Sequence, residues 1–298
     1  MPLLKHNLKY HPNTAELFAH LSHKPWAIFL DSGQPQGQYG RYDILVADPF
    51  ITVSTVEISN EIHTKIAQNG QTKISHDDPF VVLNQLLASY QAAQNSLPFS
   101  GGAVGYFGYD LMRREAKLAD LGLENGSIPQ MMLGIYDWAV VVDHREKTAC
   151  LVSHGFQQAT HDNWATLCAL FDEPFTINAE KFELTTPITS NMDFGQYANA
   201  FNKIKHYITE GDCYQVNLAQ RFSAQAIGNS WIAYNKLREI SPAPFMAYMN
   251  FGHLQVLSGS PERFLQVIGT HVETRPIKGT RPRSDDVVED QQYAADLQ

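Results

Sequence analysis

The sequence predicts an α+β fold in which antiparallel sheets pack against helices. The 298 residues exceed what one compact domain usually holds, so we expect two domains. Several short apolar runs are separated by turn residues, a pattern typical of hairpins. Helical segments alternate with these hairpins without the strand–helix–strand rhythm of a parallel sheet, which favours the mixed, antiparallel class.

The N-terminal part predicts strands and two helices. Apolar spacing predicts a helix over residues 13–21, and apolar runs predict strands over 26–31, 41–48 and 51–57. A second helix is expected from Pro79 to about residue 94, because the preceding Asp can cap it and Pro suits its first position.

A glycine-rich stretch over residues 99–110 invites comparison with phosphate-binding loops. It lacks the Lys-Ser/Thr ending of a P-loop and the later acidic residue of a dinucleotide fold. We therefore predict a strand and turns, in which glycines let neighbouring chains approach closely. After it, the apolar runs 132–142 and 149–152 flank a charged turn at 144–147 and predict a hairpin.

The predicted domain boundary lies in residues 172–191, which are polar and show no sustained periodicity. Phe182 and Leu184 within it are compatible with an edge strand. This boundary predicts an N-terminal domain over 1–175 and a second domain over 190–298.

The second domain begins with a strong helix, capped by Asp193 and ended by Gly211. Clean alternation predicts a strand over 213–222, and apolar spacing predicts a helix over 229–240. A strand over 241–249 and short β-prone runs around a turn at Gly269 follow, and an acid-rich helix begins near Asp285.

Composition excludes several classes of function. A net charge of −9 without clustered Lys or Arg argues against nucleic-acid binding. Three separated cysteines without a CxxC pair support neither a disulfide framework nor a zinc site, so we predict a cytoplasmic location. No apolar run approaches the ~20 residues of a membrane span. The twelve histidines are spaced singly, and we expect each to be solvated or in the core rather than a metal ligand.

Glu262 and Lys278 are the residues that suggest chemistry. They lie 7 residues before and 9 residues after Gly269, and both therefore fall near the open end of one predicted ribbon. Opposed residues in such a ribbon lie roughly 5 Å apart and diagonal ones roughly 7–8 Å apart, so both could address one small substrate. That would pair a general acid with an amine nucleophile. The alternative is a surface ion pair.

Three motifs resemble those of the chorismate-utilising enzymes, a family that includes anthranilate, isochorismate and aminodeoxychorismate synthases. They are SPERF at 260–264, PIKGT at 276–280 and GDCYQVNLAQRF at 211–222. The resemblance implies a fold like that of anthranilate synthase component I, with its C-terminal part missing. The Lys of PIKGT is similar to that of the aminodeoxychorismate synthases, whereas anthranilate synthases have a small residue there.

The resemblance implies a reaction. Lys278 would attack C2 of chorismate while Glu262 protonates the departing 4-hydroxyl. Ammonia would then displace the lysine to give 4-amino-4-deoxychorismate, the precursor of p-aminobenzoate and folate. Gln215 stands where isochorismate synthases use a Lys to activate water, and a neutral amide cannot act as that base. Gly279 and Thr280 would offer donors to the substrate carboxylates.

The resemblance also implies Mg²⁺ and a partner. The family's metal ligands lie after PIKGT, beyond Gln298, so we expect an N-terminal fragment of a longer protein with no metal ligands of its own. No amidotransferase motif is visible, and ammonia is therefore expected from a separate glutamine amidotransferase subunit or from solution.

A tryptophan pocket is the last feature that the resemblance implies. Its expected residues are Ser32, Tyr39, Gly40, Arg41, Tyr42, Pro244, Phe245 and Met246. Two alternatives to chorismate amination stay open: anthranilate synthase component I, and a non-catalytic fragment that binds tryptophan or an amidotransferase.

Overall fold

The computed structural model describes residues 3–33, 40–58, 61–90, 95–112, 128–173, 181–277 and 279–297. The chain divides into two compact units. Unit 1 comprises Met1–Ile177 and Asn235–Gln298, and unit 2 comprises Asn178–Tyr234. The first boundary falls in the predicted linker. Residues 235–298, however, belong with the N-terminal residues rather than with residues 190–234, because two of their strands join the N-terminal sheet.

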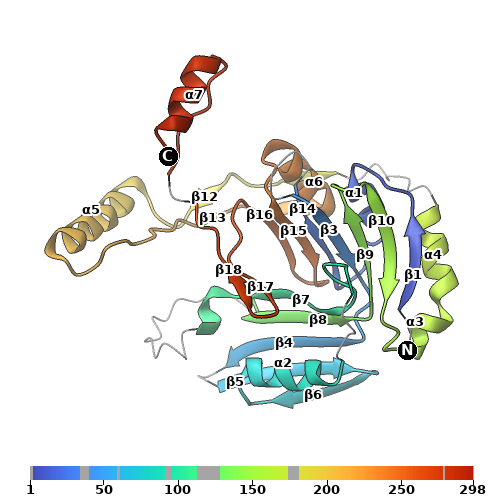
Figure 1. The fold of residues 1–298 in the computed structure, drawn as a ribbon. Helices are drawn as coiled ribbons and strands as arrows, with labels where there is room; N and C mark the ends of the chain where they lie inside the picture. The colour runs from blue at the N-terminus through green and yellow to red at the C-terminus, as the bar shows by residue number, and fades with distance from the viewer. Residues whose placement is uncertain are drawn as a thin grey trace. The chain divides into compact units, whose positions relative to one another are not determined.

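A seven-stranded antiparallel sheet forms one layer of unit 1 (Figure 1). In spatial order its strands are β1 (Leu4–Leu8), β10 (Thr148–Ser153), β9 (Trp138–Asp143), β3 (Tyr42–Val46), β2 (Ala27–Asp31), β15 (Phe245–Asn250) and β16 (Gln255–Ser260). Strands β15 and β16 come from the end of the chain, yet β15 pairs with β2, and β16 pairs with β15 at the edge of the sheet.

A five-stranded antiparallel sheet forms the second layer. Its order is β6 (Gln71–Ser75), β5 (Glu61–Gln68), β4 (Ile51–Ile58), β8 (Met131–Tyr136) and β7 (Gly102–Phe107). In β7, a Cβ on Gly105 would lie 2.0 Å from the carbonyl oxygen of Met132. The expectation that glycines in this stretch permit close approach of neighbouring chains is therefore confirmed.

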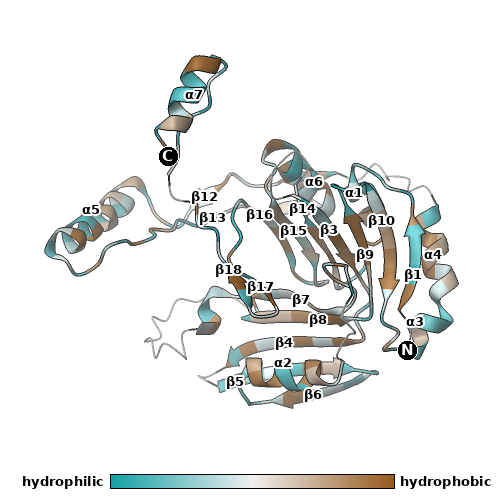
Figure 2. Cartoon of the chain, viewed as in Figure 1, coloured by the Kyte–Doolittle hydropathy of each residue, from teal (hydrophilic) through white to brown (hydrophobic). Residues whose placement is uncertain are grey.

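Two hydrophobic clusters in the described part of unit 1 lie one on each face of the five-stranded sheet. One apolar cluster joins residues of both sheets, among them Ile28, Val141 and Met132. A second cluster packs the other face of the five-stranded sheet against α2 (Pro79–Ala88) through Val53, Leu83 and Leu133. Figure 2 shows hydrophobic residues along these strands. The predicted α+β class, with antiparallel sheets and helices, is confirmed.

The helices of unit 1 include one whose N-terminal cap is predicted from the sequence. Asp78 caps α2 as predicted, because its carboxylate accepts hydrogen bonds from Phe80 N and Val81 N. Helix α3 (Gln158–Asp162) is followed directly by α4 (Trp164–Asp172). The remaining helices are α1 (Thr14–Ala19), the 3-10 turn η1 (Tyr109–Met112), α6 (Ser230–Ile240), which crosses the unit boundary, and α7 (Val287–Ala295). None of the helices in the described part of the chain is long and apolar enough to cross a membrane.

The apolar run over 132–142 is two strands rather than one. It divides at Asp137 into β8 and β9, which belong to different sheets. Asp137 is buried, and its carboxylate accepts hydrogen bonds from Phe156 N at 2.8 Å and Gln157 N at 3.1 Å. Because β8 and most of β9 are buried on both faces, hydropathy does not mark the break. Strands β1, β5 and β6 were not predicted.

The hairpin at Gly269 is confirmed. Strands β17 (Gln266–Ile268) and β18 (His271–Glu273) pair with Ile268 opposite His271, and Gly269 occupies the turn with φ of 59°. An L side chain rarely adopts this φ, which explains the glycine.

Unit 2 consists of α5 (Phe194–Glu210) and two small ladders. β11 (Phe182–Leu184) pairs with β14 (Ala226–Gly228), and β12 (Thr189–Ser190) pairs with β13 (Phe222–Ser223). The predicted caps of α5 are confirmed: Asp193 forms a capping box, and Gly211 is left-handed. The predicted strand over 213–222 is wrong, since only Phe222 is in a strand. An alternating pattern needs a hydrogen-bonding partner to become a strand, and no described strand pairs with residues 213–221.

Candidate functional site

Glu262 follows β16 in the segment that leads to the Gly269 hairpin. The Ser260 hydroxyl donates a hydrogen bond to the Glu262 carbonyl at 3.0 Å and fixes the bend of the backbone at this point. The Glu262 side chain is exposed, and the described residues provide no hydrogen-bond partner for its carboxylate. Lys278 lies outside the described residues. Gly279 and Thr280, which follow it, are exposed.

The ribbon that was expected to carry Glu262 is shorter than predicted. The β17–β18 ladder pairs three residues on each side, and the Thr274 hydroxyl donates to the Phe264 carbonyl just beyond it. Continuing the same register would place Glu262 opposite Ile277, but no ladder hydrogen bond reaches them. Pro261 and Pro276 lack the amide hydrogens that would extend it.

Charges beside this hairpin are already paired. Glu273 accepts hydrogen bonds from Arg275 at 2.7 Å and from Arg263 at 2.8 Å, and the Arg275 hydrogen bond chiefly lowers the pKa of Glu273. Arg281 lies 3.6 Å from Asp296. Gln215, the remaining predicted substrate-binding residue, is exposed and belongs to unit 2.

Most residues of the predicted tryptophan pocket gather at one end of three adjacent strands. β15 lies beside β2 with Met246 opposite Asp31, and β2 lies beside β3 with Leu30 opposite Ile44. This register brings Ser32, Tyr42 and the Pro244–Met246 segment to neighbouring positions. Gly40 and Arg41 directly precede β3, and Tyr39 lies outside the described residues.

Two of these residues have defined partners. The Arg41 guanidinium lies 4.6 Å from the centre of the Tyr42 ring and donates a hydrogen bond to Asp143 at 2.8 Å. On the other wall, Phe245 pairs with Ser260 of the SPERF motif, and the Arg263 guanidinium lies 5.3 Å from its ring centre. Phe245 and the segment that carries Glu262 are therefore in direct contact.

A buried polar network, which sequence reasoning missed, supports this end of the sheet. Ser32 donates from its backbone N at 2.7 Å and from its hydroxyl at 2.6 Å to one oxygen of Asp43, and His144 Nε2 donates to the other at 2.8 Å. Burial raises the pKa of Asp43, but the hydrogen bonds from His144 and Ser32 outweigh it, and the pKa is lowered overall. The Ser32 hydroxyl thus donates to Asp43 rather than to a ligand.

Arg238 completes the network. Its Nε donates to Asp31 at 2.5 Å and its Nη1 donates to Asn13 at 2.7 Å. The Arg238 side chain is only 7% exposed, and that of Asp31 is fully buried. The ion pair ties the end of α6 to β2, and the hydrogen bond to Asn13 ties it to the start of α1.

Removing Arg238 is expected to destabilise the protein strongly. Arg238→Ala leaves the Asp31 carboxylate buried without its cation, and we expect the free energy of unfolding to fall by about 3–5 kcal/mol. Urea unfolding at neutral pH measures this change in the free energy of unfolding. The matched control is Arg283→Ala, which removes an ion pair to Asp290 from an arginine that is 89% exposed and should change little. Equal losses of unfolding free energy in the two variants would contradict the claim that burial makes the Arg238–Asp31 ion pair important for stability.

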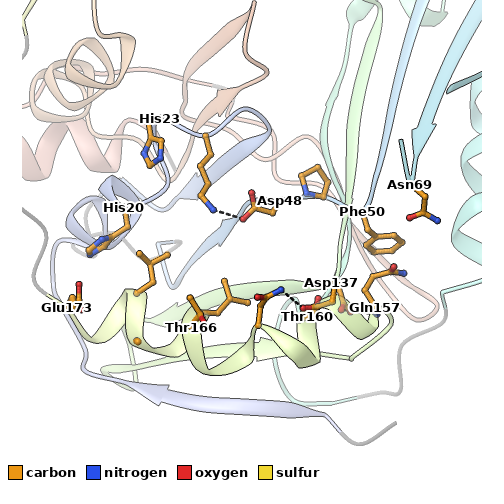
Figure 3. Close-up of a pocket in the computed structure, with 17 residues that line it drawn as sticks. His20, His23, Asp48, Phe50, Asn69, Asp137, Gln157, Thr160, Thr166 and Glu173 are labelled. Atoms are coloured by element: carbon orange, nitrogen blue, oxygen red, sulfur yellow. Dashed lines mark hydrogen bonds and ion pairs between the residues drawn. The ribbon is translucent and has the colours of Figure 1, made fainter. Parts of the chain in front are cut away.

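Unit 1 contains a cavity of about 960 Å³, lined by α3, α4 and the segments before β2 and β4 (Figure 3). None of the predicted site residues lines it. Lys24 pairs with Asp48 at 2.6 Å, and Asp137 and Glu173 add further acids. Acids outnumber Lys and Arg on its walls, so this cavity does not suit a dicarboxylate such as chorismate.

One group of residues in the described part of the chain is placed to share a metal ion. Glu61, His63 and His76 lie together on the five-stranded sheet, with ligand atoms all within 4.8 Å of one another. From the sequence, each histidine is expected to be solvated or in the core rather than a metal ligand, whereas the rings of His63 and His76 lie side by side. The predicted catalytic and tryptophan-binding residues belong to other elements, so this group is separate from them.

Comparisons with known proteins agree with the motifs. The profile of a family described as chorismate binding enzyme matches residues 28–298. The chain is 41% identical over 283 residues to a protein of Escherichia coli (strain K12) named aminodeoxychorismate synthase component 1, covering 94% of this chain and 60% of that protein. It is 32% identical to anthranilate synthase component 1 of Pseudomonas putida, with 95% and 60% covered. The chain thus spans about 60% of the length of these curated relatives.

A solved structure confirms the fold. The crystal structure of anthranilate synthase component I from Streptococcus pneumoniae TIGR4 superposes with a TM-score of 0.66 at 22% identity, covering 88% of this chain and 57% of that one.

Proposed function

Because the chain belongs to the family of chorismate binding enzymes, we propose that it aminates chorismate with ammonia to 4-amino-4-deoxychorismate, the precursor of p-aminobenzoate and folate. One observation carries the choice of product. Three relatives at 38–41% identity all have the name aminodeoxychorismate synthase component 1, whereas anthranilate synthase relatives are 28–32% identical. The Lys of PIKGT, Lys278, favours the same product.

In the proposed reaction two residues make and break bonds. The neutral Lys278 amine attacks C2 of chorismate, the ring double bonds shift, and the C4–O bond breaks as Glu262 gives its proton to the departing hydroxyl. Ammonia then adds at C4 and the lysine leaves from C2. Because Glu262 is exposed in the described structure, the bound substrate must cover its carboxyl group before the proton is transferred.

The remaining predicted residues would bind rather than react. Gln215 offers a neutral amide, which excludes base-assisted attack of water from that position. Gly279 and Thr280 would bind substrate carboxylates through backbone N–H groups and a hydroxyl. Both are exposed, so these donors are accessible.

Magnesium does not fit the described residues. The one group of possible ligands in the described part of the chain contains two imidazoles, Glu61 being its only oxygen donor, whereas Mg²⁺ takes oxygen ligands. We therefore draw no step of the reaction through Mg²⁺. We propose from the family resemblance that a glutamine amidotransferase subunit supplies the ammonia.

The test is product identification. The protein is incubated with chorismate and an ammonium salt, and the products are separated and identified by mass spectrometry. We expect 4-amino-4-deoxychorismate. Anthranilate as the product would support the anthranilate synthase alternative and contradict the proposal. Tryptophan binding without turnover would support the non-catalytic alternative.

We further propose that tryptophan binds between β3 and β15, where Tyr42 and Phe245 lie on the two sides of β2. Phe245→Ala removes one aromatic wall, and we expect affinity for tryptophan to fall about tenfold. Isothermal titration calorimetry measures the effect. Phe107→Ala is the matched control, because Phe107 lies on the five-stranded sheet. Equal affinities of the Phe245 variant and the unmodified protein would contradict this placement.

A further inference from the structure

Two histidines and a glutamate, His63, His76 and Glu61, meet on the β5–β6 hairpin, on other elements than the predicted catalytic and tryptophan-binding residues. Asn69 and Gly70 form its two-residue turn, with φ of 51° and 73°, the left-handed conformation that Asn-Gly hairpin turns require. The ladder pairs Gln68 with Gln71 and Thr64 with Ser75. One step further, the same register places His63 directly opposite His76.

Glu61, the third residue of the group, lies on the same face of the sheet as His63 and His76. Glu61 lies two residues before His63 on β5, and side chains two apart in a strand point to the same side. Their neighbours Ile62 and Thr64 are buried on the opposite face, toward α2. Glu61, His63 and His76 therefore share the face of the sheet that α2 leaves uncovered.

The hydrogen bond of His76 prepares it for coordination. Its Nδ1 lies 3.0 Å from the carbonyl oxygen of Ile62, which can only accept, so Nδ1 carries the hydrogen. In neutral His76 this leaves the lone pair on Nε2 free. Metal-bound histidines commonly donate their other ring N–H to such a carbonyl, which fixes the tautomer and the ring orientation. The His63 and His76 ring centres are 4.7 Å apart.

From this geometry we infer that Glu61, His63 and His76 bind one divalent transition-metal ion of the zinc class. Two imidazoles and a carboxylate suit Zn²⁺, Cu²⁺ or Ni²⁺ rather than Mg²⁺ or Ca²⁺. Donor atoms on one tetrahedral Zn²⁺ lie about 3.4 Å apart. The present spacing of up to 4.8 Å must therefore shorten through side-chain rotations when the ion binds. Water fills the remaining positions, because Glu61 and His76 are exposed.

The ion would have a structural effect. β6 is the edge strand of its sheet, with β5 as its only described neighbour. A metal held by residues of β5 and by His76, directly after β6, closes the open end of the hairpin opposite the Asn69-Gly70 turn. Bound metal would thus suppress fraying of this edge.

The test is a calorimetric titration of Zn²⁺ into the metal-stripped protein without an affinity tag. We expect one site, weakened at least about tenfold in His63→Ala and in His76→Ala. The matched control, His253→Ala, removes an exposed histidine outside the group and should bind like the unmodified protein. Glu61→Gln serves as a third variant at an exposed position if a histidine variant fails to fold.

Thermal unfolding gives a second readout. Zn²⁺ should raise the melting temperature of the unmodified protein and of the His253 variant, and should raise that of the His63 and His76 variants less, since a ligand of the native state stabilises it by mass action. No zinc binding by the unmodified protein would overturn the inference. So would equal binding by the variant that lacks both His63 and His76.

Discussion

Lys278→Ala is expected to stop formation of 4-amino-4-deoxychorismate, with a loss of more than about a thousandfold in kcat. Without the amine no covalent bond forms at C2, and the reaction loses the path that divides one difficult displacement into two easier ones. The measurement is the rate of product formation at saturating chorismate and ammonium.

The control for this variant is Lys73→Ala, which removes an exposed lysine from β6 and should leave the rate unchanged. An unaltered melting temperature in the Lys278 variant separates lost chemistry from lost folding. If the variant still produced 4-amino-4-deoxychorismate at the original rate, Lys278 would be excluded as the nucleophile.

Glu262→Gln carries the second large effect. The amide keeps the size of the side chain but has no proton to give to the leaving hydroxyl, so we expect kcat to fall by about 10²–10⁴. Binding of chorismate, measured by calorimetry, should change far less, because the acid acts in the transition state.

Glu183→Gln, on the exposed strand β11, is the matched control. A Glu262 variant that turned over at the same rate as this control would remove Glu262 from the acid role and leave the surface ion pair as the better reading.

Sequence alone predicts the local features of this fold well. The caps at Asp78, Asp193 and Gly211 and the turn at Gly269 each depend on a few adjacent residues, and the structure contains all four. The alternation of apolar and polar residues over 213–222, by contrast, predicts which side chains would share a face of a strand. It does not provide a neighbouring strand to hydrogen-bond with, so the predicted strand is not formed.

Long-range pairing limits what can be predicted of the site. Arg238 and Asp31 are 207 residues apart, and no local pattern links them. They meet because β15 lies beside β2, which the sequence does not reveal. His63 and His76 are different: the Asn69-Gly70 turn fixes a two-residue hairpin, and its register pairs them. The Asn69-Gly70 turn is therefore the feature of the sequence from which the group of Glu61, His63 and His76 can be predicted.

Trapping a covalent adduct tests the central claim most directly. The protein is incubated with chorismate in the absence of ammonia, digested, and its peptides are identified by mass spectrometry. The account predicts a chorismate-derived group on the Lys278 amine, which disappears when an ammonium salt is added and 4-amino-4-deoxychorismate forms. Ammonia-dependent turnover with Lys278 unmodified throughout would contradict it.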